Sequence, residues 1–185
     1  KLARTVWIPG VYNFFRIQSA SLTLVRNERY EPEQVLVVQT TAGVLESEIQ
    51  KVLSVVELPV DRPATADKPA VRKYHWSDTS EIGPEVLAKA KPVKLEPIPT
   101  QDEFARLHSF KYKAEVGRRL YVKIGKGIAS YGGYLLAQNF DTIQQVPEFP
   151  QELNIMYDGA LLSLSGEKKL TVLSRDVEAL SFELG

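Results

Sequence analysis

Apolar and polar residues alternate with a period of two through much of the chain. In residues 109–116 every second side chain is apolar, whereas the side chains between them are Ser, Lys or Glu. This pattern predicts a strand with one buried and one solvated face. Gly117-Arg118 follows as a turn signal, and alternation resumes over 120–124. These two strands are therefore predicted to form a hairpin.

Longer apolar runs predict strands that are more completely buried, at 21–25, 35–40 and 52–58. A short strand is predicted at 93–95, ended by Pro97 and Pro99. Long helical patterns do not separate these segments. The predicted class is therefore all-β, an antiparallel β-sandwich.

Helix is predicted only in one or two short pieces. Residues 46–53 place apolar side chains on one helical face, and Pro84 opens a second candidate at 83–88. Both are too short to be stable without packing against the sheets. Residues 59–73 contain three prolines and few large apolar groups, which predicts a long exposed loop or a disordered insertion.

A boundary is predicted near residues 146–151, where Pro147 and Pro150 make a stiff connector. We expect residues 1–147 to form one sandwich that includes the proline-rich loop. Residues 148–185 again show strand patterns, at 153–155, 162–164, 170–172 and 177–184. These strands are too few to close a sandwich, so they either begin a second domain or dock on the first one. We expect them to be the opening strands of a following, incomplete domain.

Composition excludes several classes of protein. The chain has 185 residues, 44% of them hydrophobic and 25% charged, which is typical of an ordered globular protein. Its 23 basic and 23 acidic residues balance, so net charge favours neither nucleic acid nor an anionic membrane as partner. The absence of cysteine excludes disulfides, cysteine–zinc sites and thiol nucleophiles within the chain.

The two ends suggest a segment of a longer protein. The chain begins without Met, and residues 181–185 stop within an alternating pattern. Neither a signal peptide nor an apolar run long enough to span a bilayer is present in the sequence. We expect any targeting signal to lie outside the 185 residues.

Histidines and hydroxyls are the first candidates for catalysis. His75-Trp76-Ser77-Asp78 brings a base, a hydroxyl and a carboxylate together in sequence. Adjacent residues on a strand or loop point in different directions, so a surface segment with a packed Trp is favoured over a relay. His75 and His108 lack the carboxylate spacing of a metal site, and no metal or cofactor is expected.

Glycines and charge clusters favour structural roles. Gly125-Lys126-Gly127 with Gly132-Gly133 matches neither a dinucleotide fingerprint nor a phosphate loop, so tight turns are predicted. The acidic pairs Glu31/Glu33 and Glu46/Glu48 are predicted to be solvated. Residues 111–126 are basic, but Tyr112 lies opposite the lysines in the alternation. A solvated face is therefore favoured over single-stranded nucleic acid binding.

Three segments carry a resemblance to a known family: Leu120–Tyr134 (LYVKIGKGIASYGGY), Val146–Met156 (VPEFPQELNIM) and Asp158–Leu170 (DGALLSLSGEKKL). Shorter matches accompany them at 19–22, 30–34, 76–78 and 81–84. From about residue 12 to its end, the chain resembles the N-terminal half of bacterial alpha-2-macroglobulins. The resemblance implies macroglobulin-like domains, which are seven-stranded sandwiches of fibronectin-III type.

The resemblance also implies a role. Bacterial alpha-2-macroglobulins trap or inhibit proteases that attack the cell envelope. They are typically periplasmic, often lipid-anchored to the inner membrane, and often associated with peptidoglycan-synthesis proteins. Their bait segment and Cys-x-Glu-Gln thioester have no counterpart here, because the chain lacks cysteine and Glu33-Gln34 follows Glu31-Pro32. We expect a non-enzymatic structural segment; the alternative is an envelope-complex binding or adhesion module that traps no protease.

Overall fold

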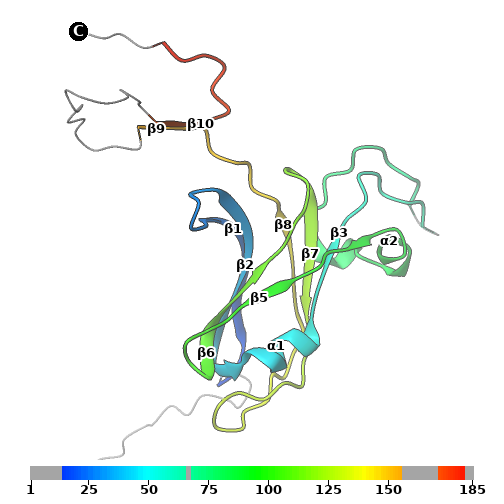
Figure 1. Ribbon diagram of the computed structural model, residues 1–185. Helices are drawn as coiled ribbons and strands as arrows, with labels where there is room; N and C mark the ends of the chain where they lie inside the picture. The colour runs from blue at the N-terminus through cyan, green and yellow to red at the C-terminus, as the bar shows by residue number, and fades with distance from the viewer. Residues whose placement is uncertain (1–13, 66–67, 156–170, 182–185) are drawn as a thin grey trace, which may run out of the picture. The chain divides into compact units, whose positions relative to one another are not determined.

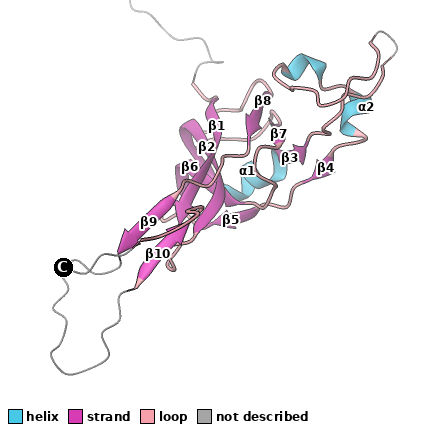
Figure 2. Cartoon of the chain, turned by 90° about the horizontal axis from the view of Figure 1, so that it is seen from above, coloured by secondary structure: helices cyan, strands magenta, loops and turns pink. Residues whose placement is uncertain are grey.

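The computed structural model describes residues 14–65, 68–155 and 171–181 (Figure 1). The chain divides into two compact units, Lys1–Pro147 and Glu148–Gly185. Among its described residues, the first unit consists mainly of two four-stranded antiparallel sheets. The predicted all-β class with short helices is confirmed, and Figure 2 shows how little of the chain is helical.

The first sheet has the strand order β1-β2-β6-β5. Its strands are β1 (Ile17–Arg26), β2 (Pro32–Leu45), β6 (Phe104–Lys111) and β5 (Glu96–Ile98). Leu22 pairs with Leu36, and Leu36 pairs with Phe110 on the next strand. Residues paired in this way lie on the same face of a sheet, so this register aligns the apolar side chains of three strands toward the core.

The second sheet has the strand order β4-β3-β7-β8. Its strands are β4 (Lys91–Pro92), β3 (Leu53–Glu57), β7 (Arg119–Ile124) and β8 (Phe140–Gln145). Alternate residues of β7 line the interior, where Leu120, Val122 and Ile124 are fully buried. They meet Leu36 and Phe110 of the first sheet in one apolar cluster. Burying each such side chain contributes about 1.5–3 kcal/mol, so this interface is the main source of stability.

Short helices connect or flank the strands. α1 (Glu46–Val52) carries the chain from β2 to β3 and buries Ile49 against the core, as predicted. α2 (Pro84–Leu87) begins with proline at its first turn, also as predicted, and buries Val86. A single 3-10 turn, η2 (Thr79–Glu81), precedes α2.

The hairpin predicted around Gly117-Arg118 is wrong. β6 ends at Lys111, and β7 belongs to the other sheet, so residues 112–118 cross between sheets. Alternation continues beyond β6 because Gln34 takes the place of a strand neighbour. Its side chain donates to the Ala114 carbonyl at 2.9 Å and accepts from the Ala114 amide at 2.8 Å.

The strand predicted at 93–95 is also wrong. Residues 93–95 link β4 on the second sheet to β5 on the first, and Pro97 lies inside β5 instead of ending it. β5 is an edge strand, where a missing amide donor is tolerated. This split gives the described first unit eight strands in its two sheets, compared with the seven that the family resemblance implies.

β8 has no counterpart in the predicted elements. Both of its faces are partly covered: Phe140 packs against the main core, and Ile143 packs against a second apolar cluster on the outside of the sheet. A strand covered on both faces lacks the clean alternation that reveals a half-exposed one.

In the second unit, β9 (Glu152–Ile155) and β10 (Val172–Arg175) form an antiparallel pair. Arg175 Nη1 lies 3.2 Å from Glu152 Oε2 and ties the two strands at one end. Residues 177–181, predicted to be a strand, are irregular. The strand predicted at 162–164 and residues 182–185 lie outside the described residues.

Candidate functional site

The connection from β3 to β4, residues 58–90, carries several of the candidate residues. It contains the proline-rich loop 59–73, the His75–Asp78 segment, η2 and α2. We call residues 58–90 the β3–β4 connection.

A second apolar cluster holds the β3–β4 connection on the outer face of the second sheet. Leu58, Trp76 and Val86 of the connection are buried with Tyr121 of β7. Tyr121 alternates with core residues along β7, so it points to the opposite face of the sheet. Its hydroxyl donates to Asp141 Oδ2 at 3.2 Å, and burial together with that carboxylate raises the pKa of Tyr121 to about 12. The outer face of this sheet is therefore covered around Tyr121.

Trp76 anchors the connection. Its indole is 1% exposed, and its Nε1 donates to the Pro59 carbonyl at 2.7 Å. The Tyr74 ring meets it edge-on, with centroids 4.8 Å apart and an interplanar angle of 77°. This is a favoured aromatic geometry. One buried side chain thus joins the beginning of the connection to its middle.

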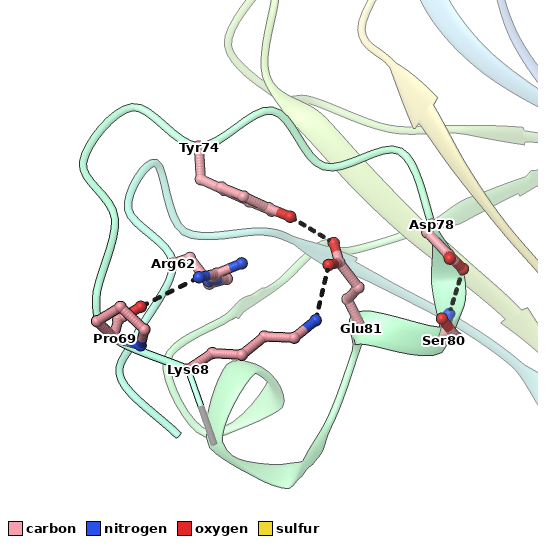
Figure 3. Close-up of polar contacts among 7 residues, drawn as sticks. All are labelled: Arg62, Lys68, Pro69, Tyr74, Asp78, Ser80 and Glu81. Atoms are coloured by element: carbon pink, nitrogen blue, oxygen red, sulfur yellow. Dashed lines mark hydrogen bonds and ion pairs between the residues drawn. The ribbon is translucent and has the colours of Figure 1, made fainter. Parts of the chain in front are cut away.

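A polar network closes over this cluster (Figure 3). The Tyr74 hydroxyl donates to Glu81 Oε2 at 2.7 Å, and Lys68 Nζ lies 3.3 Å from Glu81 Oε1. The Arg62 guanidinium sits 4.6 Å from the Tyr74 ring centre and donates to the Pro69 carbonyl at 3.1 Å. Glu81 of η2 thereby holds Lys68 of loop 59–73 with one carboxylate oxygen and Tyr74, the residue that follows the loop, with the other.

The Glu81 carboxylate is a structural acceptor in this network. The hydrogen bond from Tyr74 is the main cause that lowers its pKa below the ordinary value, with Lys68 adding to it. A general acid needs its pKa raised toward neutral pH, the opposite direction. The geometry therefore suits holding a loop, and it does not suit proton transfer.

Loop 59–73 is a loop, as predicted, but it is partly ordered by its own backbone. Arg62 and Val71 exchange two backbone hydrogen bonds, at 2.8 and 3.0 Å, and the Thr65 amide donates to the Lys68 carbonyl at 2.9 Å. These hydrogen bonds tie the two arms of the loop together; residues 66–67, between the arms, lie outside the described residues.

His75 and Asp78 do not form a relay. Arg119 Nη2 lies 3.2 Å from Nε2 of the exposed His75 ring. Asp78 Oδ1 instead accepts from the Ser80 amide at 2.8 Å, where it caps η2. Trp76 lies between them in the sequence and is buried, which agrees with the predicted surface segment that has a packed Trp. The segment serves structure at each of these positions.

His108 lies in the core between the sheets. Its ring is fully buried, and Nε2 donates to the Ala105 carbonyl at 3.0 Å. Loss of hydration is the main cause that lowers the pKa of His108 below 6.5. A neutral imidazole is therefore part of the packed native state, a role that the sequence did not reveal.

Acidification should destabilise the fold through His108. The unfolded chain takes up a proton near pH 6.5 and the native ring resists it, so stability falls as pH drops below 6.5. The slope from this group is at most about 1.4 kcal/mol per pH unit. Urea unfolding at pH 7.5, 6.5 and 5.5 should show this loss, and His108→Phe should lack it. His75→Phe, which removes the exposed imidazole, is the matched control. If the free energy of unfolding changes equally with pH in the unaltered chain and in His108→Phe, the loss of stability does not come from His108.

The glycine-rich segment makes tight turns, as predicted. Gly127, Gly132 and Gly133 have φ values of 100°, 92° and 80°, a region that side chains strongly disfavour. The basic hairpin face predicted at 111–126 is partly neutralised. Lys111 Nζ lies 2.7 Å from Glu33 Oε2, and Arg118 Nη2 lies 2.7 Å from Glu57 Oε1.

An open cavity of about 390 Å³ lies at the edge of the sandwich. Its apolar lining comes from Leu53 and Val55 of β3, from Val93 and Leu95 of the β4–β5 link, and from Phe110 of β6. These side chains can take up an apolar group, but they offer no chemistry.

Two general searches of the described residues give negative results. No three His, Cys, Asp or Glu side chains gather there in a way that could hold a metal ion. None of the helices in the same part of the chain has the length and hydropathy to cross a membrane.

Three bacterial proteins are similar to the chain over most of its length. It is 30% identical over 179 residues to an alpha-2-macroglobulin of Rickettsia conorii, covering 97% of this chain and 10% of the relative. An alpha-2-macroglobulin homolog of Yersinia pestis is 26% identical, and the alignment covers 98% of this chain and 9% of that relative. An alpha-2-macroglobulin of Pasteurella multocida is 28% identical, and the alignment covers 90% of this chain and 8% of that relative. The chain thus spans about a tenth of the length of these relatives.

No protein-family model matches the chain. Among solved structures, native alpha-2-macroglobulin from Escherichia coli, in a crystal structure spanning domains MG0-NIE-MG1, aligns with a TM-score of 0.49 and 14% identity. That alignment covers 89% of this chain and 42% of the E. coli chain.

Proposed function

The chain belongs to the bacterial alpha-2-macroglobulin family, and from this premise we propose that it is a non-catalytic structural segment of a longer protease-trapping protein. The observation that most directly supports this proposal is the similarity to the Rickettsia relative. The alignment covers 97% of the chain but only 10% of the relative. A segment of that size holds a small part of the parent's machinery. Its task is to keep a rigid module in place while other parts bind the protease.

The packing of the first unit supports a scaffold role. Two sheets share one apolar core, and the β3–β4 connection covers part of the outer face of one of them. The residues with potential chemistry have structural roles instead. His108 is buried in the core, Glu81 accepts hydrogen bonds in the polar network, and Asp78 caps η2. Such a module moves as a rigid body when a larger protein rearranges.

The remaining features of the proposal concern the parent protein. Residues 148–185 are proposed to open a following macroglobulin-like domain, of which β9 and β10 are the described strands. The location proposed is the periplasm, with a lipid anchor to the inner membrane outside this chain. Envelope proteases are the proposed partners, and peptidoglycan-synthesis proteins are proposed neighbours.

A protection assay with the parent protein tests the proposal. We expect the parent, incubated with an endoprotease, to leave the enzyme active on small peptides but shielded from a large protein inhibitor. The 185-residue chain alone should neither shield a protease nor hydrolyse ester or peptide substrates. Failure of the parent to shield any protease, together with specific capture of an envelope protein, would favour a binding module. Hydrolysis by the chain that is lost in His75→Ala would overturn the non-catalytic role.

A further inference from the structure

The edge strands of the two sheets in the first unit differ in how they are protected. An unprotected edge pairs with other strands, and proteins prevent this with short strands, proline, charge or cover. β4 is two residues long and contains Pro92, and β5 is three residues long and contains Pro97. β8 carries Asp141, and η2 packs beside it. Each of these three edges is therefore blunted.

β1 is the edge strand that lacks such protection (Figure 1). It spans ten residues, Ile17–Arg26, and contains no proline and no charge before Arg26. β2 pairs with one side of β1, and no strand of the described residues pairs with the other side. β8 lies near β1 but belongs to the second sheet. The backbone N–H and C=O groups that point outward from β1 can therefore pair with a further strand.

Two irregularities set the length of this free edge. The pairing of β1 with β2 shifts between Ile17 and Ser19 and is regular from Ser19 onward. At its other end the chain turns at Asn27, whose carbonyl accepts from the Tyr30 amide at 3.0 Å. The regular run without charge is therefore 19–25, and its central residue is Leu22.

We propose that β1 of a second copy of this chain pairs antiparallel with β1 along residues 19–25. A two-fold axis at Leu22 uses the whole run, because it places residue 19 opposite residue 25 and residue 21 opposite residue 23. Ser21 then pairs with Thr23 on the outer face, a favourable cross-strand combination. The first sheets of the two copies join into one continuous sheet with the two β1 strands at its centre.

The inner face of β1 also matches itself in this register. Leu22 faces Leu22 of the second copy, and Ala20 faces Leu24. Leu22 and Leu24 are only partly buried in one chain, and Leu22 packs against the main core. Pairing with the copy removes more of their apolar surface from water. This hydrophobic gain adds to the backbone hydrogen bonds.

The charges at the ends of β1 fit a second copy. In an antiparallel pair, the start of one strand lies beside the end of the other. Arg16, just before β1, therefore comes near Glu28, just after β1 of the copy, and Arg26 lies beside the uncharged Gln18. By symmetry the same contacts form at both ends. The charges thus favour this self-pairing over an uncharged strand of another protein.

Sedimentation equilibrium of the 185-residue chain over a concentration series tests the association. We expect the mean mass to rise from one chain toward two. Ser21→Lys with Thr23→Lys puts two Lys–Lys pairs across the axis and should raise the dissociation constant about 2- to 30-fold. Ser21→Glu with Thr23→Lys puts two Glu–Lys pairs there and should lower the constant. Leu107→Lys with Ser109→Lys, on the same face but on the inner strand β6, is the matched control and should leave it unchanged.

Disulfide cross-linking tests the register. The chain has no cysteine, so Ser21→Cys and Thr23→Cys each introduce a single thiol. In an oxidised mixture of the two variants, the 21–23 cross-link should form several-fold faster than 21–21 or 23–23, because these residues lie directly opposite. A chain that stays monomeric throughout the series overturns the proposal. Equal dissociation constants in the two variants altered at 21 and 23, an equal change in the β6 control, or cross-links without preference for 21–23 overturn it as well.

Discussion

Replacing Trp76 with alanine should lower the free energy of unfolding by about 3–5 kcal/mol, the usual cost of removing a buried tryptophan. The indole is a buried member of the second apolar cluster. Its loss also leaves the Pro59 carbonyl without its donor. The effect should concentrate in the β3–β4 connection, because the main core between the sheets does not include Trp76.

Urea unfolding followed by circular dichroism measures this loss, and limited proteolysis localises it. We expect cleavage within loop 59–73 to accelerate in Trp76→Ala before the sandwich itself is cut. Trp76→Phe keeps an aromatic ring but removes the Nε1 donor, so its loss should be smaller, about 1 kcal/mol. A stability change below about 0.5 kcal/mol in Trp76→Ala, the range of an ordinary surface substitution, would show that the cluster does not hold the connection.

Replacing Arg118 with alanine should cost about 2 kcal/mol. Arg118 places Nε 2.9 Å and Nη2 2.7 Å from Glu57 Oε1, and Nη2 also donates to the Leu58 carbonyl at 3.3 Å. Both side chains are mostly buried, with exposed fractions of 20% and 15%. Removing the guanidinium leaves a carboxylate that is poorly hydrated and has lost its partner, which is the costly way to break such a pair.

A double-mutant cycle separates the ion pair from the packing of the arginine stem. The cycle compares Arg118→Met, Glu57→Gln and the double variant that combines them. The double variant removes both charges and should regain part of the stability lost in Arg118→Met alone. Arg118→Lys keeps the positive charge but lacks the several N–H donors of the guanidinium. Its free energy of unfolding should therefore lie between those of the unaltered chain and Arg118→Ala. If Arg118→Met alone is as stable as the unaltered chain, the pair contributes nothing and the assignment is wrong.

Periodicity predicted the strands that have one buried face. β7 is the clear case, because Leu120, Val122 and Ile124 are buried in the core by the alternation visible in the sequence. Periodicity carries no information about which sheet a strand joins. The hairpin predicted at Gly117-Arg118 therefore failed, although the turn itself is there and Gly117 has a φ of 79°.

The candidate site was harder to predict because it depends on contacts between residues far apart in sequence. The sequence marked 59–73 as an exposed loop and Trp76 as packed, and both are found. It gave no sign that Tyr74, Lys68 and Glu81 would meet, because nothing in their spacing follows a helix or strand period. The buried state of His108 was missed for a related reason: its strand, β6, was predicted to begin at 109 instead of at Phe104.

The pairing of β2 with β6 has a consequence for how the chain forms. Val35 pairs with Lys111, 76 positions later, so the first sheet cannot close until that residue has been synthesised. At about 5–20 residues per second, this takes roughly 4–15 s. During that time the β1–β2 hairpin can form locally, but Leu36 and Val38 lack their cover from β6 and β7. Until β6 and β7 are available, the chain therefore carries an exposed apolar strand that is prone to aggregation.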